Sequence, residues 1–183
     1  MKKILITGGS GFIGTNFINF LSKKKIKILN IDKISKVSSP EKFKKIFYKN
    51  NYRFIKDNLN DAKKIYQILI KYKPDCIINF AAESHVDRSI DDPIYFIKNN
   101  INSATNLFHA YNKYYKLKKI KLFHISTDEV YGSIKKGEFR EHDTYNPSSP
   151  YSASKSGSDL IATAFNKTFG CKIKILCLTN NFG

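Results

Sequence analysis

The chain has 183 residues, of which 42% are hydrophobic and 26% charged, and this composition excludes a wholly disordered chain, a collagen-like repeat and a coiled coil. Its length fits one large domain with a sizeable core better than two domains. The net charge of +17 would suit an anionic partner, but only Arg53, Arg88 and Arg140 are arginines, and no base-stacking or recognition-helix pattern accompanies the lysines. We therefore expect no nucleic-acid partner.

Apolar runs alternate with amphipathic stretches along the whole chain. In chain order we expect strand 2–7, helix 12–24, strand 26–31, strand 52–56, helix 61–72, strand 75–80, helix 93–115, strand 120–126, helix 152–169 and strand 172–178. This alternation predicts an α/β fold with a Rossmann-like, doubly wound parallel sheet of about six strands. The long segments 33–51, 81–92 and 127–150 follow strands and are expected to build the ligand site.

The first strand runs directly into a glycine-rich turn, with glycines at positions 8, 11 and 14. Glycine at such a strand-turn-helix allows a tight turn, close approach of backbone N–H groups to a pyrophosphate, and packing of the helix on the strand. Asp32 ends the second strand roughly 20 residues further on, where a carboxylate can accept hydrogen bonds from both ribose hydroxyls and repel a 2′-phosphate. The segment predicts NAD rather than NADP, and Lys33 weakens that preference slightly.

The glycine spacing resembles that of short-chain dehydrogenase/reductase proteins of the extended type, which implies a catalytic Tyr-x-x-x-Lys pair. Spacing alone does not locate it, because lysine follows four residues after each of five tyrosines: Tyr52, Tyr114, Tyr115, Tyr131 and Tyr151. Tyr151 is favoured because it begins an expected helix, on which Tyr151 and Lys155 share one face. A tyrosine has a pKa near 10, so Lys155 and the positive nicotinamide ring would have to favour its anion.

Thr127, Asp128 and Glu129 follow the fifth strand. A simple reductase needs one hydroxyl donor at this place, whereas here two adjacent carboxylates follow the threonine. Two carboxylates that turn toward the same cleft push their pKa values apart and supply one acid and one base. An acid and a base beside a hydride acceptor are suited to dehydration.

Three runs resemble the dTDP-glucose 4,6-dehydratases in sequence and in order: 79–90 (NFAAESHVDRSI), 126–132 (STDEVYG) and 147–155 (PSSPYSASK). Residues 179–183 (TNNFG) resemble the start of that family's next motif. The resemblance implies a lyase of nucleotide-sugar metabolism that removes water from dTDP-glucose with NAD and gives dTDP-4-dehydro-6-deoxyglucose for deoxysugar biosynthesis.

The resemblance also implies a role for each matching residue. Tyr151 would take the proton from the sugar 4-hydroxyl, and Thr127 would hydrogen-bond the same oxygen. Glu129 would remove the C5 proton, and Asp128 would protonate the departing C6 hydroxyl. Ser84, Thr127 and Asn180 match substrate-binding positions. The positions that match cofactor contacts are Gly8, Gly11, Phe12, Ile13, Gly14, Asp32, Lys33, Asp57, Asn58, Ala81, Ala82, Asn99, Tyr151, Lys155 and Asn181.

The family is considerably longer than this chain, so residues 1–183 are expected to form its NAD-binding Rossmann domain, with the C-terminal substrate domain absent. The expected partners are the nucleotide sugar dTDP-glucose and a second copy in a homodimer, or a complementing C-terminal fragment. Two alternatives remain open. One is an NAD-binding module without turnover, and the other is an enzyme for another nucleotide sugar, such as a dehydratase or an epimerase. The Asp128–Glu129 pair argues against an epimerase.

The remaining polar residues predict little chemistry. Cys76, Cys171 and Cys177 have neither disulfide-framework nor zinc-site spacing, and we expect no metal and a reducing compartment. The N-terminal apolar run is too short for a signal peptide, and no run approaches the ~18 residues of a membrane span, so the expected location is cytoplasmic, with no membrane partner. His109, His124 and His142 are expected to be structural or surface residues. His85, Asp87 and Arg88 could form a buried network or contact substrate.

Overall fold

The computed structural model describes residues 2–35, 50–134 and 136–181, and in this part of the chain six strands form one sheet. The strands are β1 (Lys2–Thr7), β2 (Ile26–Asp32), β3 (Tyr52–Lys56), β4 (Cys76–Asn79), β5 (Lys121–Thr127) and β6 (Ile173–Leu178). Their spatial order is β3-β2-β1-β4-β5-β6, and every neighbouring pair is parallel. This is the predicted doubly wound Rossmann-like sheet, whose order reverses between β1 and β4.

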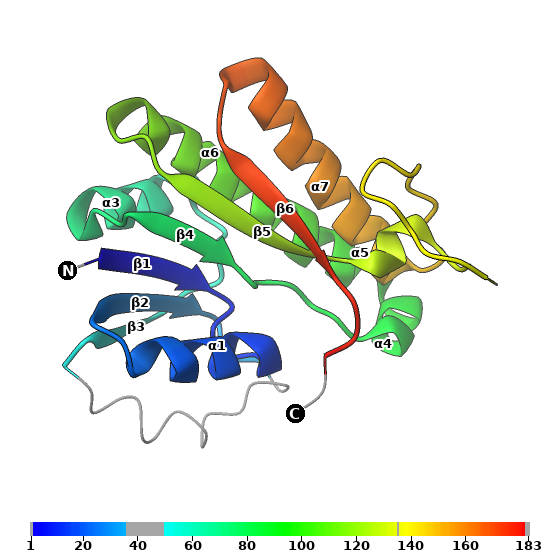
Figure 1. Cartoon of the computed structure of the whole chain (residues 1–183), viewed down its shortest axis with the longest axis horizontal. Coiled ribbons are helices and arrows are strands. Elements are labelled where there is room, and N and C mark those ends of the chain that lie inside the picture. The colour runs from blue at the N-terminus through cyan, green and yellow to red at the C-terminus, as the bar shows by residue number, and fades with distance from the viewer. Residues whose placement is uncertain (1, 36–49, 135, 182–183) are drawn as a thin grey trace.

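Helices cover both faces of the sheet. They are α1 (Phe12–Ser22), α3 (Ala62–Tyr72), α4 (Val86–Asp91), α5 (Pro93–Ile97), α6 (Ser103–Leu117) and α7 (Pro150–Phe169). Figure 1 shows α1 on one face and α3, α6 and α7 side by side on the other. No helix in the described part of the chain is both long enough and apolar enough to cross a membrane.

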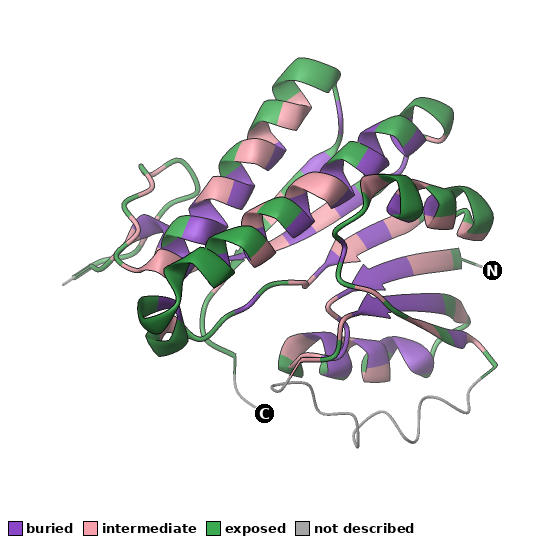
Figure 2. Ribbon diagram, turned by 180° about the vertical axis from the view of Figure 1, so that it is seen from behind, coloured by how far each residue is buried: buried purple, intermediate pink, exposed green. Residues whose placement is uncertain are grey.

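Two apolar clusters hold these layers together. The larger one joins the sheet to α3, α6 and α7, and its centre is Leu107, Phe108 and Tyr111 of α6, each fully buried. The smaller one packs Ile18 and Leu21 of α1 against β1 and β2. Figure 2 shows the buried residues of the helices on the sides that face the sheet. Each helix buries one face, so burial of the apolar side of each amphipathic helix holds it against the sheet.

The predicted single helix 93–115 is wrong in detail, because the structure divides that stretch into three pieces. α5 begins at Pro93, where the Asp92 side chain caps it by accepting a hydrogen bond from the backbone N–H of Tyr95. A π-helical turn, η1 (Lys98–Asn102), then leads into α6. The short helix α4 and a 3₁₀ turn, η2 (Asp128–Tyr131), were not predicted. Residues 94–115 contain no proline or glycine that would mark a break, so the sequence pattern does not locate the π-helical turn.

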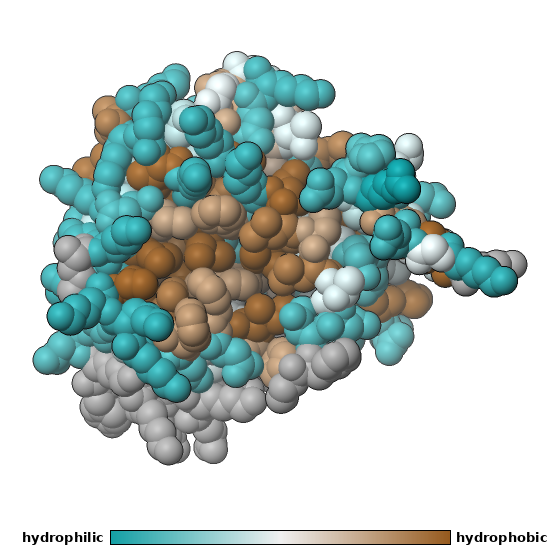
Figure 3. All heavy atoms as spheres, viewed as in Figure 1, coloured by the Kyte–Doolittle hydropathy of each residue, from teal (hydrophilic) through white to brown (hydrophobic). Residues whose placement is uncertain are grey.

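The sheet face opposite α6 and α7 is only partly covered over β4, β5 and β6. Ile78, Phe123 and Ile125 are half-buried, and Leu176 of β6 is exposed. Figure 3 shows hydrophobic side chains gathered at the centre of the face on which these strands lie. α1 covers the other half of the same face, beside β1 and β2.

Two leucines of α6 provide a matched test of which face of this helix is buried. Leu107 is fully buried, whereas Leu117 is 66% exposed. Leu107→Ala should lower the free energy of unfolding by about 2–5 kcal/mol, because it leaves a cavity in the larger cluster, and Leu117→Ala should change it by less than about 0.5 kcal/mol. Urea unfolding of both variants measures the difference. Equal losses would contradict the described packing of α6.

Candidate active site

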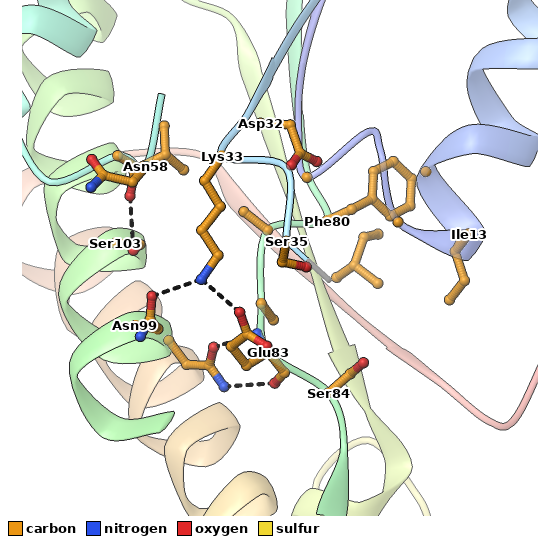
Figure 4. Close-up of a pocket in the computed structure, with 18 of the residues that line it drawn as sticks. Ile13, Asp32, Lys33, Ser35, Asn58, Phe80, Glu83, Ser84, Asn99 and Ser103 are labelled. Carbon is orange, nitrogen blue, oxygen red and sulfur yellow. Dashed lines mark hydrogen bonds and ion pairs between the residues drawn. The ribbon is translucent and has the colours of Figure 1, made fainter. Parts of the chain in front are cut away.

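A cavity of about 450 Å³ lies along the carboxyl ends of the strands. Its walls come from the segments that follow β1, β2, β3 and β4, together with the end of β5, the π-helical turn η1 and the start of α7. Figure 4 shows Lys33, Glu83 and Asn99 meeting on one side of this cavity, with Ile13 and Phe80 on another. A crevice beyond the carboxyl ends of parallel strands, at the point where their order reverses, is where such sheets bind ligands.

The glycine turn shapes one wall of this cavity. Gly8 has a φ of +70°, and a Cβ atom there would lie 2.4 Å from the backbone nitrogen of Ala81. A Cβ atom on Gly14 would lie 2.6 Å from the carbonyl oxygen of Gly8. Gly11 differs, because its backbone is extended and a Cβ atom would meet nothing closer than 3.6 Å. The fold therefore requires glycine at positions 8 and 14. At position 11 no protein atom is close enough to exclude a side chain.

Asp32 links the end of β2 to the glycine turn. Its carboxylate is buried and accepts hydrogen bonds from the backbone N–H groups of Ser10, at 2.8 Å, and Ile34, at 2.7 Å. Each bond uses a different carboxylate oxygen, so each oxygen keeps lone-pair capacity for a further donor. Asp32 therefore orders the turn and also lines the cavity as an acceptor.

Lys33 reaches across the cavity and is neutralised there. Its ammonium lies 2.6 Å from a carboxylate oxygen of Glu83 and donates to the side chains of Asn99, at 3.0 Å, and Tyr95, at 3.1 Å. Burial lowers the pKa of Lys33, but the hydrogen bonds and charge of Glu83 and Tyr95 outweigh it, so the pKa is raised. With its charge paired, this lysine is not a free binding group for a 2′-phosphate.

Asn100, in the π-helical turn η1, ties the loop after β4 to α7. Its amide accepts from the backbone N–H of Glu83, at 2.8 Å, and donates to the Glu83 carbonyl and to the Ser154 hydroxyl. Ser158 of α7 in turn donates to the Asn100 carbonyl oxygen. These contacts fix the cavity wall that carries Glu83 relative to the helix that carries Tyr151.

Tyr151 and Lys155 lie on one face of α7, as predicted from their spacing. The helix begins at Pro150, and the N-cap residue Ser149 forms a reciprocal capping box with Ser152. Both Tyr151 and Lys155 are buried and both line the cavity. Capping satisfies backbone N–H groups of the first turn and so fixes where Tyr151 enters the site.

The surroundings of Tyr151 oppose its ionisation in the ligand-free protein. Burial and the neighbouring carboxylate of Glu129 raise the pKa of Tyr151 to about 12, and a hydrogen bond with Thr127 opposes that rise. Lys155 is also buried, which lowers its pKa, and its ammonium donates to the carbonyl oxygen of Ile125 at 2.6 Å. A base at neutral pH therefore needs an additional positive charge near the phenol oxygen.

Thr127, Asp128 and Glu129 gather at the end of β5. The Thr127 hydroxyl accepts from the backbone N–H of Glu129 and donates to the Asp128 carboxylate, both at 3.3 Å. Burial, followed by the charge of Asp128, raises the pKa of Glu129. A carboxylate with a raised pKa is a stronger base, and this is the direction expected for a proton acceptor.

The cavity contains most of the predicted cofactor positions. Those that line it are Gly8, Gly11, Phe12, Ile13, Gly14, Asp32, Lys33, Asp57, Asn58, Ala81, Ala82, Asn99, Tyr151 and Lys155, and the predicted substrate residue Ser84 lines it too. Asn180 and Asn181 are exposed and are not among the described lining residues. Thr127, Asp128 and Glu129 do not line the cavity themselves. They lie beside Tyr151, which does line it.

Several lining residues were missed by the sequence analysis. They are Ile31, Ser35, Leu59, Phe80, Glu83, Asn100, Ser103, Ile125 and Ser126. Glu83 directly follows the largely apolar run 77–82 (IINFAA) and is only 4% exposed, so a carboxylate at the end of such a run was the available signal for an internal ion pair.

The histidines and their neighbours are placed as follows. His85, Asp87 and Arg88 are exposed, so the structure does not support a buried network among them, and His85 lines the cavity. His124 is buried in the core, whereas His109 is exposed. Within the described ranges, no cluster of three or more histidine, cysteine or acidic residues could hold a metal ion.

Comparison with known proteins gives a consistent result. The sequence model of a family described as GDP-mannose 4,6 dehydratase matches residues 5–183. The probable dTDP-glucose 4,6-dehydratase of Sinorhizobium fredii is 38% identical over 188 residues, which cover 99% of this chain and 54% of that protein. The chain thus spans about half the length of the curated relatives it matches.

Two solved structures show the same fold over nearly the whole chain. The dTDP-glucose 4,6-dehydratase DesIV from Streptomyces venezuelae, crystallised with NAD bound, has a TM-score of 0.90 and 34% identity, covering 99% of this chain and 56% of that one. A UDP-N-acetylglucosamine 4-epimerase from Methanobrevibacter ruminantium has a TM-score of 0.88 and 30% identity, covering 100% of this chain and 56% of that one. Dehydratases and epimerases share this half of the fold, so the residues after β5 become the informative ones.

The raised pKa of Glu129 predicts that the free energy of unfolding depends on pH. Because the pKa is higher in the folded than in the unfolded state, stability falls as pH rises above the ordinary value of 4.5. Relative to the parent chain, Glu129→Gln should therefore gain free energy of unfolding between pH 4 and pH 7, as measured by urea unfolding at both values. Glu138→Gln, at an exposed position, is the matched control and should show a smaller change. A Glu129→Gln gain no larger than the control would contradict this environment for Glu129.

Proposed function

Because the chain belongs to the GDP-mannose 4,6 dehydratase family, we propose that it acts as an NAD-dependent nucleotide-sugar 4,6-dehydratase that removes water from dTDP-glucose and gives dTDP-4-dehydro-6-deoxyglucose. The observation that carries this proposal is the pair of adjacent carboxylates, Asp128 and Glu129, beside Tyr151 and Thr127. The 38% identical relative from Sinorhizobium fredii, a probable dTDP-glucose 4,6-dehydratase, supports the choice of substrate.

The cavity fits a dinucleotide at three places. Gly11, the N-cap residue of α1, has clear space for the close approach of a pyrophosphate to the helix N-terminus. Asp32 keeps acceptor capacity for ribose hydroxyls. Glu83 pairs with Lys33, so this lysine, among the described residues at the end of β2, is not a free cation that would favour NADP. When bound, NAD supplies a hydride acceptor that can later return the hydride to the same sugar.

The chain's own residues carry out the proton transfers. Tyr151 takes the proton of the sugar 4-hydroxyl, and Thr127, whose hydroxyl lies within hydrogen-bond reach of Tyr151, hydrogen-bonds the same sugar oxygen. Oxidation at C4 acidifies the C5 proton, which Glu129 removes, since a raised pKa makes this carboxylate more basic than an ordinary glutamate. Asp128 gives a proton to the departing C6 hydroxyl, so that water leaves as a neutral molecule.

The site also bears on the alternatives. An epimerase requires only a tyrosine–lysine pair and a hydroxyl, and the 30% identical epimerase shares this fold. The two carboxylates after Thr127 favour dehydration, because epimerisation has no use for an acid at C6. The homodimer and the cytoplasmic location that the resemblance implies stay predictions, as does the identity of the nucleotide base.

Gly11 provides a test of dinucleotide binding that is separate from folding. Its backbone has φ −74° and ψ 174°, which any residue adopts, and its Cβ position is clear of protein atoms. Gly11→Ala should keep the thermal unfolding midpoint within about 2 °C and weaken NAD binding at least about tenfold, measured by calorimetric titration. Gly157→Ala on α7, outside the cavity lining, is the control and should bind NAD as the parent does. Undiminished NAD affinity in Gly11→Ala would contradict the proposed pyrophosphate position.

Mass spectrometry of the sugar nucleotide tests the reaction itself. The chain incubated with NAD and dTDP-glucose should release a product lighter than the substrate by one water. Glu129→Gln should reduce the rate by about 10²-fold or more while NAD still binds, because the C5 proton then has no acceptor. NAD binding without any product in the parent chain would indicate a binding module. An isomeric product of unchanged mass would indicate an epimerase and contradict the proposal.

A further inference from the structure

A ladder of polar side chains crosses the sheet below the candidate site. Thr7 of β1, Asn79 of β4 and His124 of β5 are direct partners in the strand register. The Thr7 hydroxyl donates to the Asn79 side-chain oxygen at 2.5 Å, and the Asn79 amide nitrogen lies 2.8 Å from Nδ1 of His124. All three residues are at most 1% exposed. None of them has a task in the proposed reaction.

The orientation of this ladder follows from one backbone group. The N–H of Ala81 donates to the same Asn79 oxygen, at 3.1 Å, so that oxygen is an acceptor and the other amide atom is the NH₂ group. The NH₂ group therefore donates to Nδ1 of His124, which must carry no proton. Burial, followed by repulsion from Lys155, lowers the pKa of His124 well below 6.5 and keeps the ring neutral. A neutral ring with a bare Nδ1 carries its proton on Nε2.

Nε2 of His124 faces the carboxylate of Asp159. The two atoms lie 3.4 Å apart, and Asp159 is fully buried on α7, one helical turn after Lys155. Among the described residues, neither Nε2 nor this carboxylate oxygen forms a hydrogen bond, so the 3.4 Å contact between them is an electrostatic one. The second carboxylate oxygen accepts from the hydroxyl of Ser126, the residue before Thr127, and from the hydroxyl of Tyr145 at 3.4 Å.

Asp159 is also the counter-charge for the buried ammonium of Lys155. The charged and titratable groups that act on Lys155 are Asp159 of the same helix, Cys177 of β6 and His124 of β5. Burial lowers the pKa of Lys155, and Asp159 is the strongest opposing influence. Burial likewise raises the pKa of Asp159, which Lys155 opposes, so the two charges stabilise each other.

We propose that Asp159 is a positioning residue for the Tyr151–Lys155 pair. Its carboxylate, oriented by His124, keeps Lys155 charged below Tyr151 and ties α7 to the end of β5 through Ser126, beside Thr127. Asp159 is not among the residues that line the cavity, so it acts through Lys155 and Ser126, which do line it. The inference rests on the proposed function only for the catalytic task of Tyr151 and Lys155. The arrangement of charges itself is present in the ligand-free chain.

NMR on the ligand-free chain tests the proposal without turnover or NAD. In ¹⁵N spectra of the parent, His124 should show a bare Nδ1 and a protonated Nε2 throughout pH 5–8. A proton on Nδ1, or a titration of His124 within that range, would contradict the orientation of Asp159. This measurement needs no variant, so it decides the point even if substitution at Asp159 prevents folding.

The titration of Lys155 tests the charge itself. Followed through its side-chain ¹³Cε signal, the Lys155 midpoint should fall by about one pH unit or more in Asp159→Asn, because burial is then unopposed. Asp75→Asn makes the same chemical change just before β4, at the amino ends of the strands, where Asp75 pairs with Lys118, and should leave the Lys155 midpoint unchanged. Equal midpoints in Asp159→Asn and the parent would overturn the proposal. If the parent chain fails to bind NAD or to turn over substrate, the proposed function is contradicted, but the comparison of the Lys155 midpoints still decides the role of Asp159.

Discussion

The parallel register of β1, β4 and β5 is the constraint on which the rest of the structure depends. It makes Thr7, Asn79 and His124 direct neighbours and brings the ends of the three strands to one edge. One residue past this ladder the chain turns at Gly8, and three residues past it stands Thr127. A shift of one residue in the pairing would turn each side chain to the other face and separate these groups. The buried hydrogen bonds of the ladder therefore specify the register that assembles the site.

Charge divides the candidate site into two regions. At the β2 side, Lys33 is paired with Glu83, and Asp32 accepts two backbone hydrogen bonds. At the β5 side, Glu129 and burial hold the pKa of Tyr151 at about 12. Tyr151 is therefore a poor base in the ligand-free chain, and a bound positive ring would lower its pKa. Under the proposed function, this electrostatic arrangement would couple cofactor binding to activation of the tyrosine.

Much of this arrangement was predictable from the sequence, because it depends on local patterns. The bounds of β1 and β3 were predicted to the residue, and the glycine turn, Asp32 and the Tyr151–Lys155 helix follow from spacing and capping signals. The Lys33–Glu83 pair and the contact of His124 with Asp159 join residues 50 and 35 positions apart. Their meeting depends on strand order and register, which the spacing of residues along the chain does not contain. The π-helical turn that begins at Lys98 was missed because the residues around it include no proline or glycine that would signal a break in the helix.

A crystal structure of the chain grown with NAD tests most directly the central claim, that the edge defined by this register is a dinucleotide site. The account predicts density for the dinucleotide along the cavity, with a ribose at Asp32, the pyrophosphate at Gly11 and the nicotinamide ring beside Tyr151. Density for NAD elsewhere, or a cavity without NAD at saturating concentration, would contradict it.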